Sequence, residues 1–361
     1  MASIPSLANI GLSALRASQT ALSTAGHNIA NVNTEGYSRQ RVELQTATPQ
    51  NLNGFNLGNG VAVRTVSRVV SSAVNTQLQV QTSNSSDASK FLDLANRIDN
   101  VLADTNTGLT PALSSFFSAA QEVADNPSSS IERQVLLSEA DNLARRFQVL
   151  DDRLEDLDTL VNAEVRDTVS EVNALAQSVA DLNQQISTVS ARASEPNDLL
   201  DRRDQLIRQI GERVGISTVD LGDGTVNVMV GGSQGLVLGT QTNPLQVVSS
   251  VFDATQLEVA NDAGININSQ ITGGTLGGAL RFRDEVLTGA QNALGRVAAG
   301  VVEGFNAQHR LGMDFNGNLG GDFFVSTAPQ VCCQREQYGR VCDRCAHRRQ
   351  WAHDLRLSAH V

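Results

Sequence analysis

The chain has 361 residues, enough for two or three domains, and only 4% of them are aromatic, so an aliphatic core is expected. A net charge of -11 and a single lysine, Lys90, exclude a basic surface for nucleic acid. No apolar run approaches the roughly 20 residues of a membrane span, and no cleavable secretory signal precedes Arg16, the first basic residue.

Residues 5–31 have the apolar spacing of an amphipathic helix. Small residues lie beside its apolar stripe and permit the close approach of a partner helix. The stripe contains Leu12, Leu15, Leu22 and Ile29, and the small residues are Gly11, Ala14, Ala21 and Ala25. The helix leads into a turn at residues 28–37, where asparagine side chains can bond the local backbone and Gly36 can adopt a positive φ.

A long helix is expected after a short strand at residues 61–66 and a helix carrying Phe91 to Val101. It begins near Ser129 and Glu132, which have the spacing of a capping box, and Pro196 ends it. Its apolar residues follow a heptad seam with one four-residue stutter. The seam contains Leu150, Leu154, Leu157, Val161, Val165, Val172, Leu175, Val179, Leu182, Ile186 and Val189.

Residues 215–271 change to a period of two, with a hairpin turn at residues 222–224, and helical spacing returns at residues 280–307. The predicted fold is α+β and predominantly α, an elongated helical bundle or coiled-coil rod with an inserted small antiparallel β domain. Five segments are expected: an N-terminal helix and turn (1–45), a helical rod (46–214), the β domain (215–275), a returning helix and polar loop (276–330) and a foreign tail (331–361).

Ser233 lies in a Gly-x-Ser-x-Gly pattern that resembles a hydrolase nucleophile elbow. That elbow needs a helix after the serine, whereas residues 236–238 continue as a strand. A hairpin turn explains the glycines, and an esterase is disfavoured.

Asp314, Asn316, Asn318 and Asp322 place oxygen ligands at alternate positions, as calcium loops do. Leu319 stands where an EF-hand needs glycine, and Val325 where it needs glutamate. The loop is therefore interpreted as a polar turn.

Asp201 and Asp204 share one face of a helix, where two carboxylates could hold a metal or act as acid and base. Arg208 lies four residues beyond Asp204. Intrahelical ion pairing on a solvated face is the favoured interpretation.

Residues 331–361 differ in composition from the rest, because they contain every cysteine and carry a charge of +3 against -14 for the first 330 residues. Their possible zinc ligands are Cys332, Cys333, Cys342, Cys345, His347 and His353. The adjacent cysteine pair lacks zinc-knuckle spacing, and few apolar residues accompany it. A zinc or redox protein is one alternative, and out-of-frame translation of this segment is the other.

Several motifs together resemble one family. The N-terminal pattern, with Asn28-Ile-Ala-Asn31 and Gly36-Tyr-Ser-Arg-Gln40, is similar to flagellar axial proteins, and its ending is similar to the hook-associated protein 1 (FlgK) family. Further blocks at residues 197–207, 277–286, 306–310 and 320–324 resemble the same family. The resemblance spans residues 3–329.

The resemblance implies a structural subunit, not an enzyme, at the hook-filament junction, secreted through the flagellar type III export apparatus without a cleavable signal. It implies a ring of copies and contacts with the hook protein and hook-associated protein 3, with no cofactor, metal, nucleic acid or membrane. A rod or hook subunit is the alternative. The expected subunit interface comprises Leu7, Leu12, Leu15, Leu22, Ile29, Asn28, Asn31, Asn33, Gly36 and Tyr37.

The family would continue after Pro329 with more outer-domain sequence and a C-terminal heptad helix that pairs with the N-terminal one. Residues 331–361 show neither feature. A truncated or frameshifted chain that assembles poorly is therefore expected.

Overall fold

The computed structural model describes residues 4–52, 55–102, 108–191, 195–314, 316–325 and 356–357. Helices dominate it and its sheets are small and antiparallel, which confirms the α+β, predominantly α class. Two compact units share the chain. Unit 1 contains Met1–Ser85, Ser170–Leu245 and Gln270–Gly274, and unit 2 contains Ser86–Val169, Gln246–Ser269 and Thr275–Val361.

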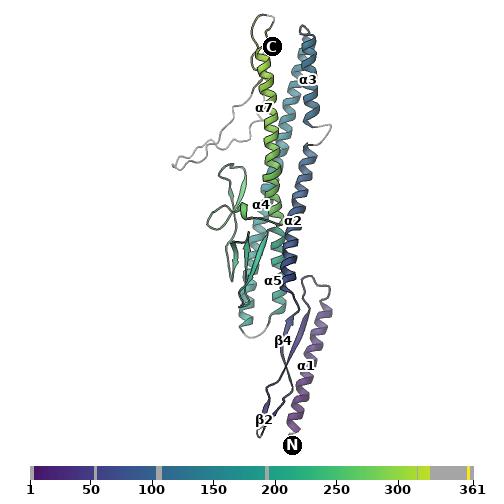
Figure 1. The fold of residues 1–361 in the computed structure, drawn as a ribbon, viewed down its shortest axis with the longest axis vertical. Coiled ribbons are helices and arrows are strands. Elements are labelled where there is room, and N and C mark those ends of the chain that lie inside the picture. The colour runs from purple at the N-terminus through teal and green to yellow at the C-terminus, as the bar shows by residue number, and fades with distance from the viewer. Residues whose placement is uncertain are drawn as a thin grey trace. The chain divides into compact units, whose positions relative to one another are not determined.

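The helices follow the order drawn in Figure 1: α1 (Ile4–Ala30), α2 (Ser72–Leu102), α3 (Leu109–Asp125), α4 (Ser130–Ser190), α5 (Asn197–Arg213), α6 (Gly274–Phe282) and α7 (Thr288–Arg310). A 3-10 turn, η1 (Asn268–Gln270), precedes α6, and a π-helical segment, η2 (Arg283–Leu287), joins α6 to α7. Within the described ranges, no helix combines the length and apolar composition that a membrane-spanning segment needs.

The strands are β1 (Gln40–Thr46), β2 (Gln50–Leu52), β3 (Phe55–Leu57), β4 (Val61–Arg68), β5 (Ile216–Asp220), β6 (Val226–Val230), β7 (Gln234–Leu238), β8 (Gln241–Thr242), β9 (Gln246–Ser249), β10 (Leu257–Ala260), β11 (Phe324–Val325) and β12 (Arg356–Leu357). One sheet has four strands in the order β5-β6-β7-β8, and the other pairs are β1-β4, β2-β3, β9-β10 and β11-β12.

In unit 1, α1 runs beside the β1-β4 hairpin (Figure 1). The four-stranded sheet buries Val228, Val230 and Leu236. The predicted hairpin turn before β6 is confirmed, with positive φ at Gly222 and Gly224. Asn183 of α4 holds this sheet, because its amide bonds both the N–H and the C=O of Val226.

Helix α4 begins where the capping-box spacing places it. Ser129 Oγ accepts the N–H of Glu132 at 3.3 Å. Most of the predicted seam is buried, with an exposed fraction of 0% at Leu154, Val165 and Val179, and Leu175 and Val189 are half-buried. A heptad pattern therefore identified a helix whose apolar face is covered within the chain.

Unit 2 has two sets of internal anchors. Asn162 of α4 binds the carbonyl of Thr255 and the N–H of Leu257, which fixes the β9-β10 hairpin. An aromatic cluster forms where α3, α7 and β11 meet, and it contains Phe116, Phe305, Phe323 and Phe324. The predicted single β segment at residues 215–275 contains two separate sheets, and its role as one domain stays a prediction.

Candidate assembly interface

Helix α1 packs against β1 and β4 with a face of small and polar side chains. The residues on this inner face are buried or half-buried: Ser13, Ala17, Thr20, Thr24, Asn28 and Asn31. Their spacing of three and four positions places them on one side of the helix. The side of α1 that the chain covers is therefore its polar side.

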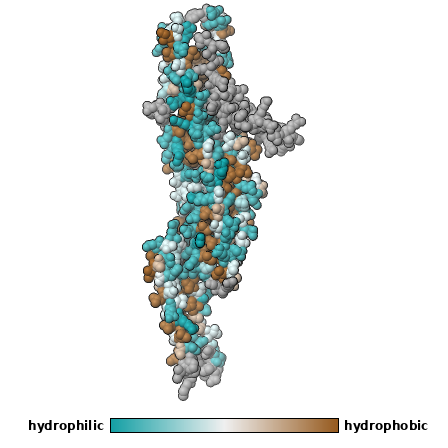
Figure 2. All heavy atoms as spheres, turned by 180° about the vertical axis from the view of Figure 1, so that it is seen from behind, coloured by the Kyte–Doolittle hydropathy of each residue, from teal (hydrophilic) through white to brown (hydrophobic). Residues whose placement is uncertain are grey.

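Five large aliphatic side chains of α1 lie toward the opposite side, which we call the free face. The exposed fraction is 72% for Leu7, 44% for Leu12, 56% for Leu15, 76% for Leu22 and 75% for Ile29. Figure 2 shows apolar side chains in brown at the surface in the lower part of the molecule, where Figure 1 places α1. An amphipathic helix normally buries its apolar stripe. Here the described residues of the chain leave that stripe uncovered.

The inner face approaches the hairpin closely at Ser13. Ser13 Oγ accepts the N–H of Val61 at 3.2 Å and donates to the carbonyl of Ile10 at 2.7 Å. Gly60 has a φ of 88°, and a Cβ there would overlap Ser13 Oγ. A glycine is therefore required where the hairpin meets α1.

Asn28 connects the end of α1 to β1. Its Nδ2 donates to the carbonyl of Gln40 at 2.9 Å, and its Oδ1 accepts the N–H of Gln40 at 2.8 Å. The hydroxyl of Tyr37 donates to the same Oδ1 at 2.6 Å. The amide of Asn28 thus bonds Gln40 as a neighbouring strand would.

Asn31 and Gly36 shape the turn after α1. Asn31 Nδ2 donates to the carbonyl of His27 at 3.1 Å, and the N–H of Thr34 donates to the carbonyl of Asn31 at 2.9 Å. Gly36 has a φ of 80°, as the sequence predicted. Asn33 is exposed. The predicted site thus divides into residues that build the turn and residues that face outward.

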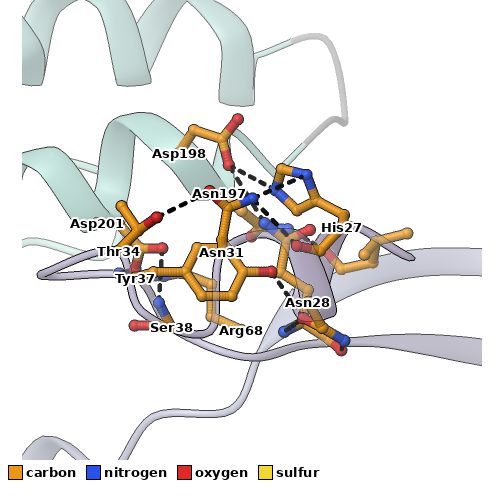
Figure 3. A network of polar contacts seen from close by, with 12 residues as sticks. His27, Asn28, Asn31, Thr34, Tyr37, Ser38, Arg68, Asn197, Asp198 and Asp201 are labelled. Carbon is orange, nitrogen blue, oxygen red and sulfur yellow. Dashed lines mark hydrogen bonds and ion pairs between the residues drawn. The ribbon is translucent and has the colours of Figure 1, made fainter. Parts of the chain in front are cut away.

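The turn and the hairpin are tied to α5 by the polar network in Figure 3. Asp201 Oδ2 accepts the N–H of Ser38 at 2.9 Å, and Arg68 Nη1 donates to Asp201 at 2.7 Å and to Asp204 at 2.8 Å. Asn197 Nδ2 donates to the carbonyl of Val66 at 2.6 Å. Each of these bonds joins residues more than 130 positions apart in the chain.

The interpretation of Asp201 and Asp204 as a solvated, intrahelical ion pair is wrong. Asp201 is buried, and both carboxylates bind Arg68 of β4. Arg203, between them, is also buried and donates to the carbonyl of Gly224. The strand pattern at residues 61–66 gave no reason to connect Arg68 with a helix so distant in sequence.

The network also changes two protonation equilibria. Burial raises the pKa of Tyr37, and the negative charges of Asp201 and Asp198 raise it further. Burial opposes the charge of Arg68, but its bonds to Asp201 and Asp204 outweigh burial and raise its pKa. Arg68 is therefore a fixed cation, and Tyr37 keeps its proton beside two carboxylates.

The other candidate sites have structural explanations or lie outside the described residues. Ser233 sits in the β6-β7 hairpin turn and donates to Gln270 Oε1 at 3.0 Å, which confirms the turn interpretation. The carboxylate of Asp314 accepts the N–H groups of Asn316 and Asn318, so the polar-turn interpretation is confirmed. No cluster in the described ranges contains three His, Cys, Asp or Glu side chains placed for a metal ion. The cysteines and histidines of residues 331–353 lie outside those ranges.

Comparison with known proteins decides the family. Residues 95–324, more than half of the chain, match the model described as the flagellar hook-associated protein FlgK helical domain. This chain belongs to the FlgK family. Residues 9–37, which include most of α1 and its turn, also match the flagella basal body rod protein model. The N-terminal helix of this chain is therefore similar to rod proteins as well.

Relatives and a solved structure agree with this assignment to the FlgK family. The chain is 36% identical over 333 residues to flagellar hook-associated protein 1 of Salmonella typhimurium, covering 90% of the chain and 60% of the relative. The chain is 34% identical over 343 residues to the Escherichia coli protein of the same name, covering 93% of the chain and 63% of that relative. The flagellar hook junction protein FlgK from Burkholderia pseudomallei has a TM-score of 0.65 at 31% identity, over 72% of this chain and 47% of that one. The chain thus spans about 60% of the length of these curated relatives.

Proposed function

We propose that this FlgK-family chain is a structural subunit of the flagellum at the hook-filament junction, exported by the flagellar type III apparatus and without enzymatic activity. The observation that carries the proposal is the orientation of α1, which packs its polar side on its own hairpin and leaves its apolar side free. A subunit that must bind its neighbours needs such a face.

The free face supplies an energetic reason to assemble. Fully burying a leucine or isoleucine side chain contributes roughly 1.5–3 kcal/mol. Leu7, Leu15, Leu22 and Ile29 retain more than half of their exposure, so a helix packed on them would recover about half of that from each. The expected occupants are the C-terminal heptad helix that the family resemblance implies and, in the assembled ring, helices of neighbouring copies, of the hook protein and of hook-associated protein 3.

The test uses hooks stripped of their junction proteins and a fusion of this chain to the C-terminal heptad helix of a relative. We expect the fusion to bind the hook ends. Leu22→Gln should weaken binding about tenfold or more, because one buried leucine of the interface is lost. Ser23→Gln is the matched control, since it introduces the same side chain about 100° around the helix. A fusion that does not bind, or two variants that bind equally, would reject the proposal.

The expected assembly defect is tested in the same assay. It rests on the change in composition at residues 331–361. The chain without the fused helix should bind hooks at least about tenfold more weakly than the fusion, because the fused helix packs on the free face of α1 and stabilises it. Equal binding of hooks by the chain and the fusion would contradict the expected assembly defect and would not affect the proposed junction role.

A rod or hook subunit is the alternative within the flagellum, and the match of residues 9–37 to the rod protein model favours it. The longer match to the FlgK helical domain favours the junction. Binding to stripped hooks, with no binding to isolated rods, is the result that distinguishes the two. A zinc or redox protein acting through the cysteines is the disfavoured alternative from another functional class, and a zinc titration of the purified chain tests it.

A further inference from the structure

The contact between α5 and the N-terminal segment of residues 27–68 contains many polar and charged groups. Its hydrogen bonds and ion pairs come from Arg68, Ser38 and Asn197 with their partners, and from Gln40, which donates to Asp198 at 3.2 Å. His27 lies 3.7 Å from the same aspartate. Figure 3 shows these groups converging between the turn and α5.

Several large apolar side chains beside this contact are exposed, whereas Tyr37 and Val66 within the segment are half-buried. The apolar residues beside the junction in sequence, Ile29, Val32, Val69 and Val70, are all exposed. The buried isoleucines of α5, Ile207 and Ile210, follow its polar segment. A set of directional polar bonds therefore joins the segment to α5.

We propose that Arg68, Asp201 and Asp204 form a charge latch that fixes the N-terminal segment on α5 and so orients the free face of α1 toward neighbouring subunits. The orienting role rests on the proposed function, and the latch itself does not. Arg68, Asp201 and Asp204 are positioning residues, since the free face of α1 makes the proposed contact.

The geometry explains why charges suit this task. The Arg68 side chain is 11% exposed, and those of Asp201 and Asp204 are 9% and 25% exposed. Arg68 Nη1 donates to both carboxylates, and these hydrogen bonds depend on direction, whereas apolar surfaces can slide. A buried ion that loses its partner is strongly unfavourable, so intermediate positions of the segment are disfavoured.

Asp201 is the central member of the latch. One oxygen binds Arg68 and the other accepts the N–H of Ser38, so it joins β4, the turn and α5 together. Gly36 supports this arrangement, because a Cβ there would lie 3.1 Å from Arg208 Nη2 of α5. The turn is thus seated closely on α5 where the latch closes.

Hydrogen exchange of the full chain tests the latch without any assembly step. In Arg68→Met, amides of the turn, β1 and β4 should exchange about tenfold faster or more, while β5-β8 and α4 stay within about twofold. Asp201→Asn should act in the same segment, and Asp204→Asn less, because Asp204 is more exposed and does not bind Ser38. Arg68→Lys should be intermediate, because it keeps a positive charge but replaces the planar guanidinium by a more strongly hydrated ammonium group.

Asp93→Asn is the control, because Asp93 forms an exposed ion pair with Arg97 on α2. Unchanged exchange in Arg68→Met and Asp201→Asn would overturn the latch. A uniform increase through β5-β8 in both variants would also overturn it, because these residues would then stabilise unit 1 as a whole.

The orienting role has its own readout in the hook assay. The fusion carrying Arg68→Met should lose at least about tenfold in hook binding, although its free face is unaltered. Faster exchange with unchanged hook binding would overturn the orienting role while leaving the junction function intact. Absence of binding by the parent fusion would instead reject the junction function, and the exchange result would still decide the latch.

Discussion

Helices α1 and α4 both carry an apolar stripe at helical spacing, but the chain buries the stripe of α4 and leaves that of α1 exposed. In α4, Leu154, Val172 and Ile186 of the heptad seam are completely buried within the chain. In α1, Leu15, Leu22 and their neighbours point away from the hairpin that the helix packs on. An apolar stripe in the sequence therefore predicts a helix face that becomes buried. Whether the same chain buries it depends on which side of the helix packs on the rest of the chain.

The inner face of α1 sharpens this difference. Thr20 and Thr24 each donate to a carbonyl one turn earlier in the helix, at 3.1 Å and 2.9 Å. Asn28 and Ser13 bond the backbone of β1 and β4. Helix α1 is thus attached to the hairpin by hydrogen bonds beside the buried Ala17, whereas α4 combines a buried apolar seam with polar anchors such as Asn183. Variants can test these contributions.

The largest expected difference comes from truncating one leucine in each helix within unit 1. Leu182→Ala in α4 should lower the free energy of unfolding by about 2–5 kcal/mol, because Leu182 is buried and leaves a cavity. Leu22→Ala in α1 should stay within about 0.5 kcal/mol, because Leu22 is exposed. Urea unfolding of both variants measures this. Equal losses would show that the free face of α1 is covered in the isolated chain.

A smaller effect is expected at Asn28. Asn28→Ala should cost about 1–3 kcal/mol, because the N–H and carbonyl of Gln40 lose their partner in a half-buried place. Asn33→Ala, at an exposed position of the same turn, is the control and should change stability little. Urea unfolding measures the free energy of unfolding of both variants. Equal values for the two variants would contradict the structure.

The smallest effect is expected at Tyr37. Tyr37→Phe removes one hydrogen bond to Asn28 and should cost about 0.5–1.5 kcal/mol at pH 8. The pKa of Tyr37 is raised above its ordinary value of 10.0, so its contribution is complete below pH 10 and is lost as pH rises through the higher folded-state pKa. Unfolding measured from pH 8 to pH 11 should show the two chains converging. A constant difference would contradict this.

The sequence predicted those parts of the molecule that depend on local periodicity. The span of α1, the start of α4 and its seam, and the glycine turn before β6 follow from spacing and turn chemistry within a few residues. Ser129 is a clear case, because its capping role requires only Glu132 three positions later.

The sequence did not predict the charge latch, and the reason is physical. Asp201 and Asp204 look like an ordinary solvated helix face, and their partner Arg68 lies 133 and 136 positions away. The charge of a carboxylate does not indicate which cation, distant in the sequence, will pair with it in a buried place. The same holds for Asn28, whose turn-forming role was expected but whose pairing with Gln40 depends on the path of β1.

The pairing of Asn28 with Gln40 has a consequence for unwanted association. A two-stranded ribbon leaves backbone donors and acceptors open along its outer edges, where strands of other molecules can add and start aggregates. The Asn28 amide occupies the outward-facing groups of Gln40 at the start of β1. Helix α1 thereby prevents strands of other molecules from pairing with β1 at Gln40, while its free face remains accessible to partner helices.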